Sequence, residues 1–313
     1  MLSLPLNIER SIVIEKSIDE VFNVVADFNT WRTWSPWLCQ EPDCPVNIEG
    51  DAGQAGHTQR WDGQRIGSGE MAVSSVNPPH RIEYQLTFLK PWKSRNKVAF
   101  DLAAHNNGTK LTWYMRGTTP VFLFYMRKMM SALVGSDYER GLSMLKEYVE
   151  TGEVPSHIDI PGEIAAEEFY YVGKRRSCGL NEVGPAMEVD FSALKSAVEK
   201  GDLRSGDFAV SFYHKYDMVN KQCEYTSGFG YNTLATARTD NVISGHVEQH
   251  QALRVDHKGP YRHLGNAWTA AQGLLRYSKK KPSKTVPMYE IYGNFPGEVE
   301  DKDTQTKIHI PLR

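Results

Sequence analysis

Residues 252–268 read ALRVDHKGPYRHLGNAW and predict a strand, a tight turn and a helix in direct succession. Apolar residues alternate before the turn, which favours the strand, and residues 258–260 reverse the chain. The proline of this turn suits the first turn of a helix, where a missing N–H leaves no bond unmade. Tyr261, Leu264 and Trp268 then fall on one helical stripe, which predicts a helix with one apolar and aromatic side.

The segment that follows, residues 287–292 (PMYEIY), reads as a strand in which Glu290 is out of place. Side chains alternate along a strand, so Met288, Glu290 and Tyr292 share one face. A carboxylate on an apolar face costs free energy unless it has a partner or a task. On an edge strand Glu290 would simply reach water or an arginine. In an aromatic groove it would hold a cationic ligand, or act as an acid or base with a raised pKa.

The second half of the chain repeats its order of elements, strand, helix, strand, strand, after about 80 residues. This shift superposes two stretches: Phe208, Val210 and Phe212 on Met288, Glu290 and Tyr292. Glu290 would then replace an apolar residue of the first repeat. We expect a pseudo-twofold duplicated domain with a groove between its halves.

The first half predicts a strand over residues 8–15 and a helix from Ser17, where Ser17 and Glu20 have the spacing of a capping box. Several segments with period two follow, which indicates antiparallel strands with one buried face. Residues 106–108 form an Asn-Asn-Gly hairpin turn, and a last helix spans residues 137–150. We expect an antiparallel sheet wrapped over this long helix.

The chain has 313 residues, enough for two domains. Two prolines and two glycines predict a linker over residues 151–166, so the domains are expected at 1–150 and 167–313. Formal net charge is −2, shared evenly between the halves, which speaks against a nucleic-acid-binding module. The longest apolar run, residues 121–126, is far shorter than a membrane span and predicts a buried or amphipathic helix.

The four cysteines and ten histidines form no arrangement typical of a metal site. There is no CxxC pair and no HExxH motif, and His246 and His250 stand four apart without a carboxylate motif. The cysteines are typical of reduced thiols in a cytoplasmic protein. No glycine-rich phosphate loop is present, and we expect neither a metal nor a cofactor.

The first half resembles the START-like/polyketide-cyclase (SRPBCC) superfamily over residues 5–150. The resemblance is carried by residues 27–37 (DFNTWRTWSPW) and 138–146 (YERGLSMLK). It implies a helix-grip fold with a hydrophobic cavity between sheet and helix. It implies no particular reaction, since members range from lipid carriers to cyclases.

The second half resembles the GyrI-like effector-binding family over residues 168–313. The resemblance is carried by residues 257–261, Leu264, Trp268, 287–292 and 306–312. The family's pocket glutamate matches Glu290. Members sense small molecules in bacterial AraC- and MerR-type regulators; some stand-alone members are hydrolases of cyclopropane-bearing natural products, and others bind DNA gyrase. This chain has no helix-turn-helix, so direct contact with nucleic acid is not expected.

Together these features predict two α+β domains, each around an apolar concavity. The expected function is binding or sensing of hydrophobic or aromatic small molecules, including cations. The alternatives are a hydrolase of strained-ring compounds that uses Glu290 as its catalytic residue, and a gyrase-modulating interaction protein. The sequence leaves the oligomeric state open. The expected ligand-binding residues are Glu290, Tyr292, Met288, Tyr261, Trp268, Phe208 and Phe212.

Overall fold

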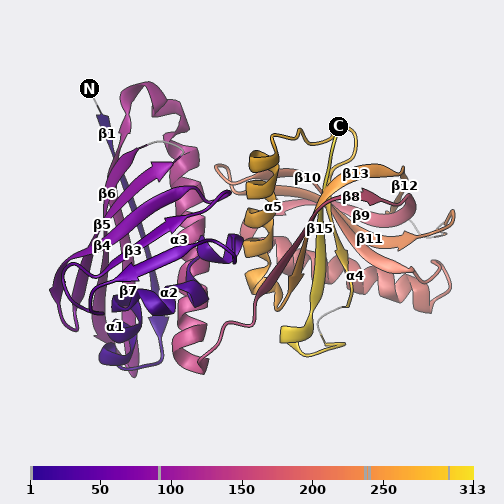
Figure 1. Ribbon diagram of the computed structural model, residues 1–313. Coiled ribbons are helices and arrows are strands. Elements are labelled where there is room, and N and C mark those ends of the chain that lie inside the picture. The colour runs from indigo at the N-terminus through magenta and orange to yellow at the C-terminus, as the bar shows by residue number, and fades with distance from the viewer. Residues whose placement is uncertain (1–2, 91–92, 236–237, 239–240, 295–296) are drawn as a thin grey trace. The chain divides into compact units, whose positions relative to one another are not determined.

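The computed structural model describes residues 3–90, 93–235, 238, 241–294 and 297–313. The chain divides into two compact units, Met1–Val154 and Pro155–Arg313. Both combine helices with a large antiparallel sheet, as Figure 1 shows.

The first unit contains a seven-stranded sheet in the order β1-β7-β6-β5-β4-β3-β2. Its strands are β1 (Ser3–Ile14), β2 (Val46–Glu49), β3 (Thr58–Asp62), β4 (Ser68–Asn77), β5 (Arg81–Lys90), β6 (Ser94–His105) and β7 (Gly108–Pro120). Its helices are α1 (Ile18–Ala26), α2 (Phe28–Trp34), α3 (Arg127–Thr151) and the 3₁₀ turns η1 (Leu38–Gln40) and η2 (Val121–Met126). All neighbouring strands are antiparallel, which agrees with the period of two in the sequence.

Local sequence explains the ends of the helices in this unit. Ser17 caps α1, and the side chain of Glu20 returns a hydrogen bond to the cap, so the predicted capping box is present. The apolar run 121–126 forms the 3₁₀ helix η2, which leads directly into α3. Helix α3 therefore begins ten residues before the expected position.

Aromatic side chains occupy the space between the sheet and α3, where the family resemblance implies a cavity. Trp113 of β7 stacks on Tyr138 of α3 with ring centroids 4.0 Å apart. Trp31 and Trp34 of α2 approach the Trp113 ring edge-on, with centroids 6.2 and 5.9 Å away. These rings are almost completely buried, so a ligand in this interior would have to displace them.

The second unit contains an eight-stranded sheet in the order β12-β9-β11-β10-β14-β15-β13-β8. The strands are β8 (His157–Ala166), β9 (Phe169–Gly179), β10 (Phe208–Asp217), β11 (Gln222–Tyr231), β12 (Ile243–Val247), β13 (His250–Lys258), β14 (Met288–Tyr292) and β15 (Gln305–Pro311). Its helices are α4 (Val183–Glu199), α5 (Leu264–Ser278) and the 3₁₀ turns η3 (Leu180–Glu182), η4 (Tyr261–His263) and η5 (Asp301–Asp303).

Most of the stretch predicted as a linker is a strand. Residues 157–166 form β8, which pairs with β13 at the edge of the second sheet. Pro161 is tolerated because an edge strand leaves one row of N–H groups unpaired. Gly162 has φ +84°, which a glycine adopts without strain, and the pairing register shifts opposite it.

The strand registers assign the two faces of the second sheet. At its centre β10 and β14 pair with Ser211 opposite Glu290 and Phe212 opposite Tyr289. Directly opposed residues in an antiparallel pair share a face, so Ser211 and Glu290 share one. Val210 is the neighbour of Ser211 in β10, so its side chain points to the other face. The predicted equivalence of Val210 and Glu290 is therefore wrong, because the two side chains lie on opposite faces of the sheet. A shift by an odd number of residues would place equivalent residues on the same face.

Both long helices of the second unit pack on the face that carries Glu290. Leu194 of α4 belongs to the same buried cluster as Tyr292. Ala267 of α5 packs with Ile308, which lies opposite Glu290 on β15. The other face holds a separate cluster that contains Val210, Phe212 and Tyr289. Glu290 thus lies on a strip of sheet between the two helix contacts.

Candidate ligand-binding site

Glu290 is a buried carboxylate held by three neutral donors. Its exposed fraction is 1%. The indole Nε1 of Trp268 donates to Oε1 at 2.5 Å, and the hydroxyl of Tyr292 donates to Oε2 at 2.5 Å. The hydroxyl of Tyr213 on β10 adds a third hydrogen bond. Helix α5 and two central strands therefore converge on one carboxyl group.

Burial dominates the titration of this group and raises the pKa of Glu290 above its ordinary value. The three donors oppose that shift because they stabilise the ionised form. Burial and the carboxylate's charge together raise the pKa of Tyr213 and of Tyr292, so both phenols keep the protons they donate. Among the residues that the structure describes, no lysine or arginine pairs with Glu290.

Aromatic rings surround this carboxylate. Tyr213 and Trp268 meet edge to face with centroids 5.2 Å apart. Tyr292 makes similar contacts at 5.8 Å with Tyr261 of η4 and with Phe191 of α4. Tyr213, Trp268 and Tyr261 are only half-buried, so the ring cluster extends from Glu290 to the surface of the unit.

The structure brings together most of the predicted site residues but not all of them. Tyr261, Trp268 and Tyr292 surround Glu290, as described. Met288 lies on the same face, where the side-chain amide of Gln272 contacts its sulfur at 3.4 Å. Phe208 and Phe212 belong instead to the cluster on the opposite face, where they pack with Phe169 and Tyr289. They do not line the site.

Sequence reasoning missed Tyr213, Phe191 and Ser211. Ser211 lies opposite Glu290 in the strand register, shares a 2.7 Å hydrogen bond with Ser227 and also interacts with the Tyr292 hydroxyl. An odd shift between the repeats would have found Tyr213, since the odd-numbered residues of β10 face the helices. Phe191 had no such signal, because a phenylalanine in a helix is usually a core residue.

An ion pair between a buried carboxylate and a half-exposed guanidinium fixes α4 over the sheet beside this site. The carboxylate of Asp190 is fully buried and receives two hydrogen bonds, at 2.9 and 2.5 Å, from the guanidinium of Arg176 on β9. The hydroxyl of Tyr225 on β11 donates to the same carboxylate at 2.9 Å. This cluster holds the helix that carries Phe191.

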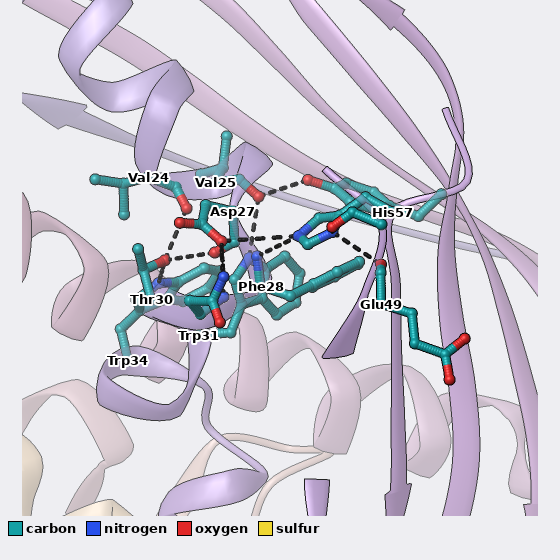
Figure 2. A network of polar contacts seen from close by, with 12 residues as sticks. Val24, Val25, Asp27, Phe28, Thr30, Trp31, Trp34, Glu49 and His57 are labelled. Carbon is teal, nitrogen blue, oxygen red and sulfur yellow. Dashed lines mark hydrogen bonds and ion pairs between the residues drawn. The ribbon is translucent and has the colours of Figure 1, made fainter. Parts of the chain in front are cut away.

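The first unit contains a second polar network, around His57 (Figure 2). The backbone N–H of Phe28 donates to Nε2 of His57 at 3.0 Å, so Nε2 is the acceptor and Nδ1 carries the proton. Nδ1 lies 3.1 and 3.0 Å from the carbonyl oxygens of Glu49 and Gly50. Asp27 Oδ1 stands 3.7 Å from Nε2. Both ring nitrogens are engaged, so this histidine positions the start of α2.

Two features are absent from the described part of the chain. Among the described residues, no group of three or more histidine, cysteine, aspartate or glutamate side chains is placed to hold a metal ion. Within the same residues, no helix has the length and apolar character needed to cross a membrane.

Residues 5–150 match the model of the family "Polyketide cyclase / dehydrase and lipid transport", so the first unit is similar to that family. None of the curated proteins is similar enough in sequence to count as a match. Solved structures similar to the chain include the Aha1 dimer from Colwellia psychrerythraea, at 19% identity and a TM-score of 0.36, covering 47% of this chain and 98% of that one. Another is a protein of unknown function from Staphylococcus aureus, at 17% identity and a TM-score of 0.40, covering 48% and 96%.

Proposed function

We propose that the chain binds small hydrophobic or aromatic molecules, cations among them, and that Glu290 is the electrostatic anchor of this binding. The observation that supports the proposal is a buried carboxylate surrounded by neutral donors and aromatic rings, without a cationic partner among the described residues. A buried charge of this kind is costly unless an opposite charge compensates it. A cationic ligand would supply that charge, and the rings would contact its face.

The proposed binding mode requires the rings over Glu290 to move. Tyr213 and Trp268 are half-buried, and each reaches Glu290 with a single polar atom. Rotation of either ring would open a path from the surface to the carboxylate. Burying about 200 Å² of an apolar ligand contributes roughly 5 kcal/mol before ordering costs, so the charge must provide much of the selectivity.

The resemblance to the GyrI-like family supports the same assignment and also suggests a hydrolase. A hydrolase would need Glu290 to activate a water or protonate a leaving group. Both carboxylate oxygens already accept hydrogen bonds from protein donors at 2.5 Å, and the residue is 1% exposed. These contacts favour a carboxylate that holds charge over one that activates water.

For the first unit we infer a role in holding a hydrophobic molecule, in keeping with its family description. The interior rings of Trp113 and Tyr138 would then have to separate to admit a ligand. This role is distinct from that of Glu290 and needs no exchange between the two units.

The test compares two ions of one shape and opposite charge, tetraphenylphosphonium and tetraphenylborate, by isothermal titration calorimetry. We expect the cation to bind and Glu290→Gln to weaken it at least about tenfold, since the variant keeps the shape and removes the charge. Glu248→Gln, at an exposed position, is the matched control. Equal affinity for the two ions, or an unchanged cation affinity in Glu290→Gln, would contradict the proposal.

The pH dependence provides a second readout. Because the pKa of Glu290 is raised, the carboxyl takes up a proton at a higher pH than an exposed glutamate does. Cation affinity should therefore fall as the pH decreases through this raised pKa, and Glu290→Gln should remove the dependence. If the protein instead consumes a cyclopropane-bearing compound, and this turnover is lost in Glu290→Gln, the hydrolase assignment replaces the binding one.

A further inference from the structure

One end of the first unit exposes large apolar side chains, which we call the apolar tip: Leu89, Phe124, Tyr125, Met129 and Leu133. Phe124 and Tyr125 are 65% and 68% exposed, and the other three are 44–50% exposed. Tyr125, Met129 and Leu133 are spaced by four residues across η2 and α3, so they form one stripe. An exposed apolar cluster of this kind marks an interaction surface.

The tip lies at the end of the sheet where β5 and β7 finish and β6 begins (Figure 1). Strand β7 continues directly into η2 and α3, which carry four of the five tip residues. Leu89 is the penultimate residue of β5, and β5, β6 and β7 are neighbours in the sheet. The five side chains therefore project from one end of the unit.

Exposed basic residues lie near this end of β6 and β7 and at the start of α3, and we call them the basic rim: Arg95, Lys97, Arg116, Arg127 and Lys128. Residues 89–100 and 115–136 contain no aspartate or glutamate at all, although the whole chain has a net charge of −2. Among the described residues none of these five cations forms an ion pair, although Lys97 lies close enough to Glu83 to lower the pKa of that carboxyl. The rim is a local concentration of positive charge.

Part of the rim lines a hollow of about 360 Å³ on this end of the sheet. Arg95, Lys97 and Arg116 line it together with Gln85 and Asn96. In the strand register Lys97 lies opposite both Gln85 and Arg116. Two guanidinium groups and an ammonium group around one hollow are suited to a phosphate, which arginine binds through two parallel hydrogen bonds.

We propose that this end of the first unit docks on the surface of a lipid bilayer that contains anionic phospholipids. The apolar tip enters the boundary between headgroups and acyl chains, and the basic rim lies among the headgroup phosphates, one of which occupies the hollow. Apolar insertion combined with basic residues is the usual chemistry of peripheral membrane binding. Docking would bring the first unit to a source of hydrophobic molecules.

The composition of the tip favours a bilayer over a nucleic acid, which would also attract the basic rim. Nucleic acids bind exposed aromatic rings by base stacking. Three of the five tip residues, Leu89, Met129 and Leu133, are aliphatic or thioether side chains, which have no stacking surface but mix with acyl chains. The proposal concerns the first unit alone, so its failure would leave the role of Glu290 unaffected.

The test is co-sedimentation of the full chain with vesicles of phosphatidylcholine alone and with about 30% phosphatidylglycerol added. We expect binding to the anionic vesicles that weakens as salt is raised, because salt screens exposed charges. Arg127→Glu with Lys128→Glu should weaken binding about 25-fold or more, at roughly fivefold per charge. Phe124→Ser with Tyr125→Ser should weaken it by a similar factor through lost apolar contact.

Two matched double variants of the second unit serve as controls. Val189→Ser with Tyr216→Ser removes apolar residues that are 61% and 58% exposed, and Lys281→Glu with Lys284→Glu reverses two exposed charges. Both should bind vesicles like the unaltered chain, and circular dichroism should show all four variants folded. The proposal is overturned if the chain does not bind anionic vesicles, or if the tip and rim variants bind vesicles like the controls. It is also overturned if the chain binds a DNA duplex through the rim, so that the rim variants weaken this binding, and does not bind vesicles.

Discussion

Two buried histidines should make the second unit lose stability in mild acid. His257 of β13 and His309 of β15 are 2% and 5% exposed. His257 Nε2 lies 3.1 Å from the Ser156 hydroxyl, and the His309 ring stacks on Tyr289 with centroids 4.7 Å apart. Burial lowers the pKa of each imidazole to about 4, with help from nearby positive groups.

The sign follows from which state takes up the proton. In the unfolded chain each histidine binds a proton near its ordinary pKa of about 6.5, whereas the native imidazole stays neutral down to about pH 4. The stability that these residues contribute is thus complete above about pH 6.5 and declines as the pH falls toward 4. At about pH 5 the difference of roughly 1.5 pH units is worth about 2 kcal/mol for each histidine.

Urea unfolding at about pH 7 and pH 5 measures this loss, and hydrogen exchange of β13 and β15 assigns it to the second unit. His257→Gln and His309→Phe each remove one titrating group, and His309→Phe keeps the stacked ring. Between the two pH values, the free energy of unfolding of the double variant should fall by about 4 kcal/mol less than that of the unaltered chain. His105→Gln, at the exposed end of β6 in the first unit, is the control. The reasoning is refuted if the double variant shows the same dependence on pH as the unaltered chain.

Three further comparisons test the packing. Trp31 and Trp113 are equally buried, but only the Trp31 indole has a described acceptor, a carbonyl of α1 at 3.0 Å. Trp31→Phe should therefore cost about 1 kcal/mol more than Trp113→Phe in urea unfolding. A Cβ at Gly141 would lie 2.9 Å from two side chains, whereas one at Gly184 would meet nothing within 4 Å. Gly141→Ala should lower the melting temperature, at a cost of about 1–3 kcal/mol, and Gly184→Ala should raise it slightly. Asp190→Ala should cost about 2–3 kcal/mol in urea, because it leaves a half-exposed guanidinium and a buried phenol without their acceptor.

The elements that sequence predicts well are those in which one local pattern decides the structure. The alternation over β5, β6 and β7 has a period that only a half-buried strand satisfies, and the capping box marks the start of α1. The strand β8 was missed because Pro161 and Gly162 are local breakers. They are tolerated because β8 is an edge strand and its pairing with β13 shifts register there. Both features depend on the whole sheet and cannot be read from the local sequence.

The candidate site could be predicted from the sequence only in part. The sequence singles out Glu290 because a charge interrupts an apolar strand, and the structure buries it. The partners on β10 could not be read from a repeat with low identity, since a slip of one residue exchanges the two faces of a strand. That slip placed Phe208 and Phe212 in the site and left Tyr213 out of it.

The position of Glu290 explains how one carboxylate could couple ligand binding to the packing of both helices in the second unit. Its donors come from α5 through Trp268, from β10 through Tyr213 and from β14 through Tyr292. Helix α4 is near it through the ring contact of Phe191 with Tyr292. A cation that replaces the Trp268 donor would release α5 from the carboxylate, yet Asp190 would still tie α4 to the sheet. The helix that moves on binding should therefore be α5. Three of its buried residues are the small alanines Ala267, Ala270 and Ala271, whereas α4 is also held by the ion pair of Asp190 with Arg176.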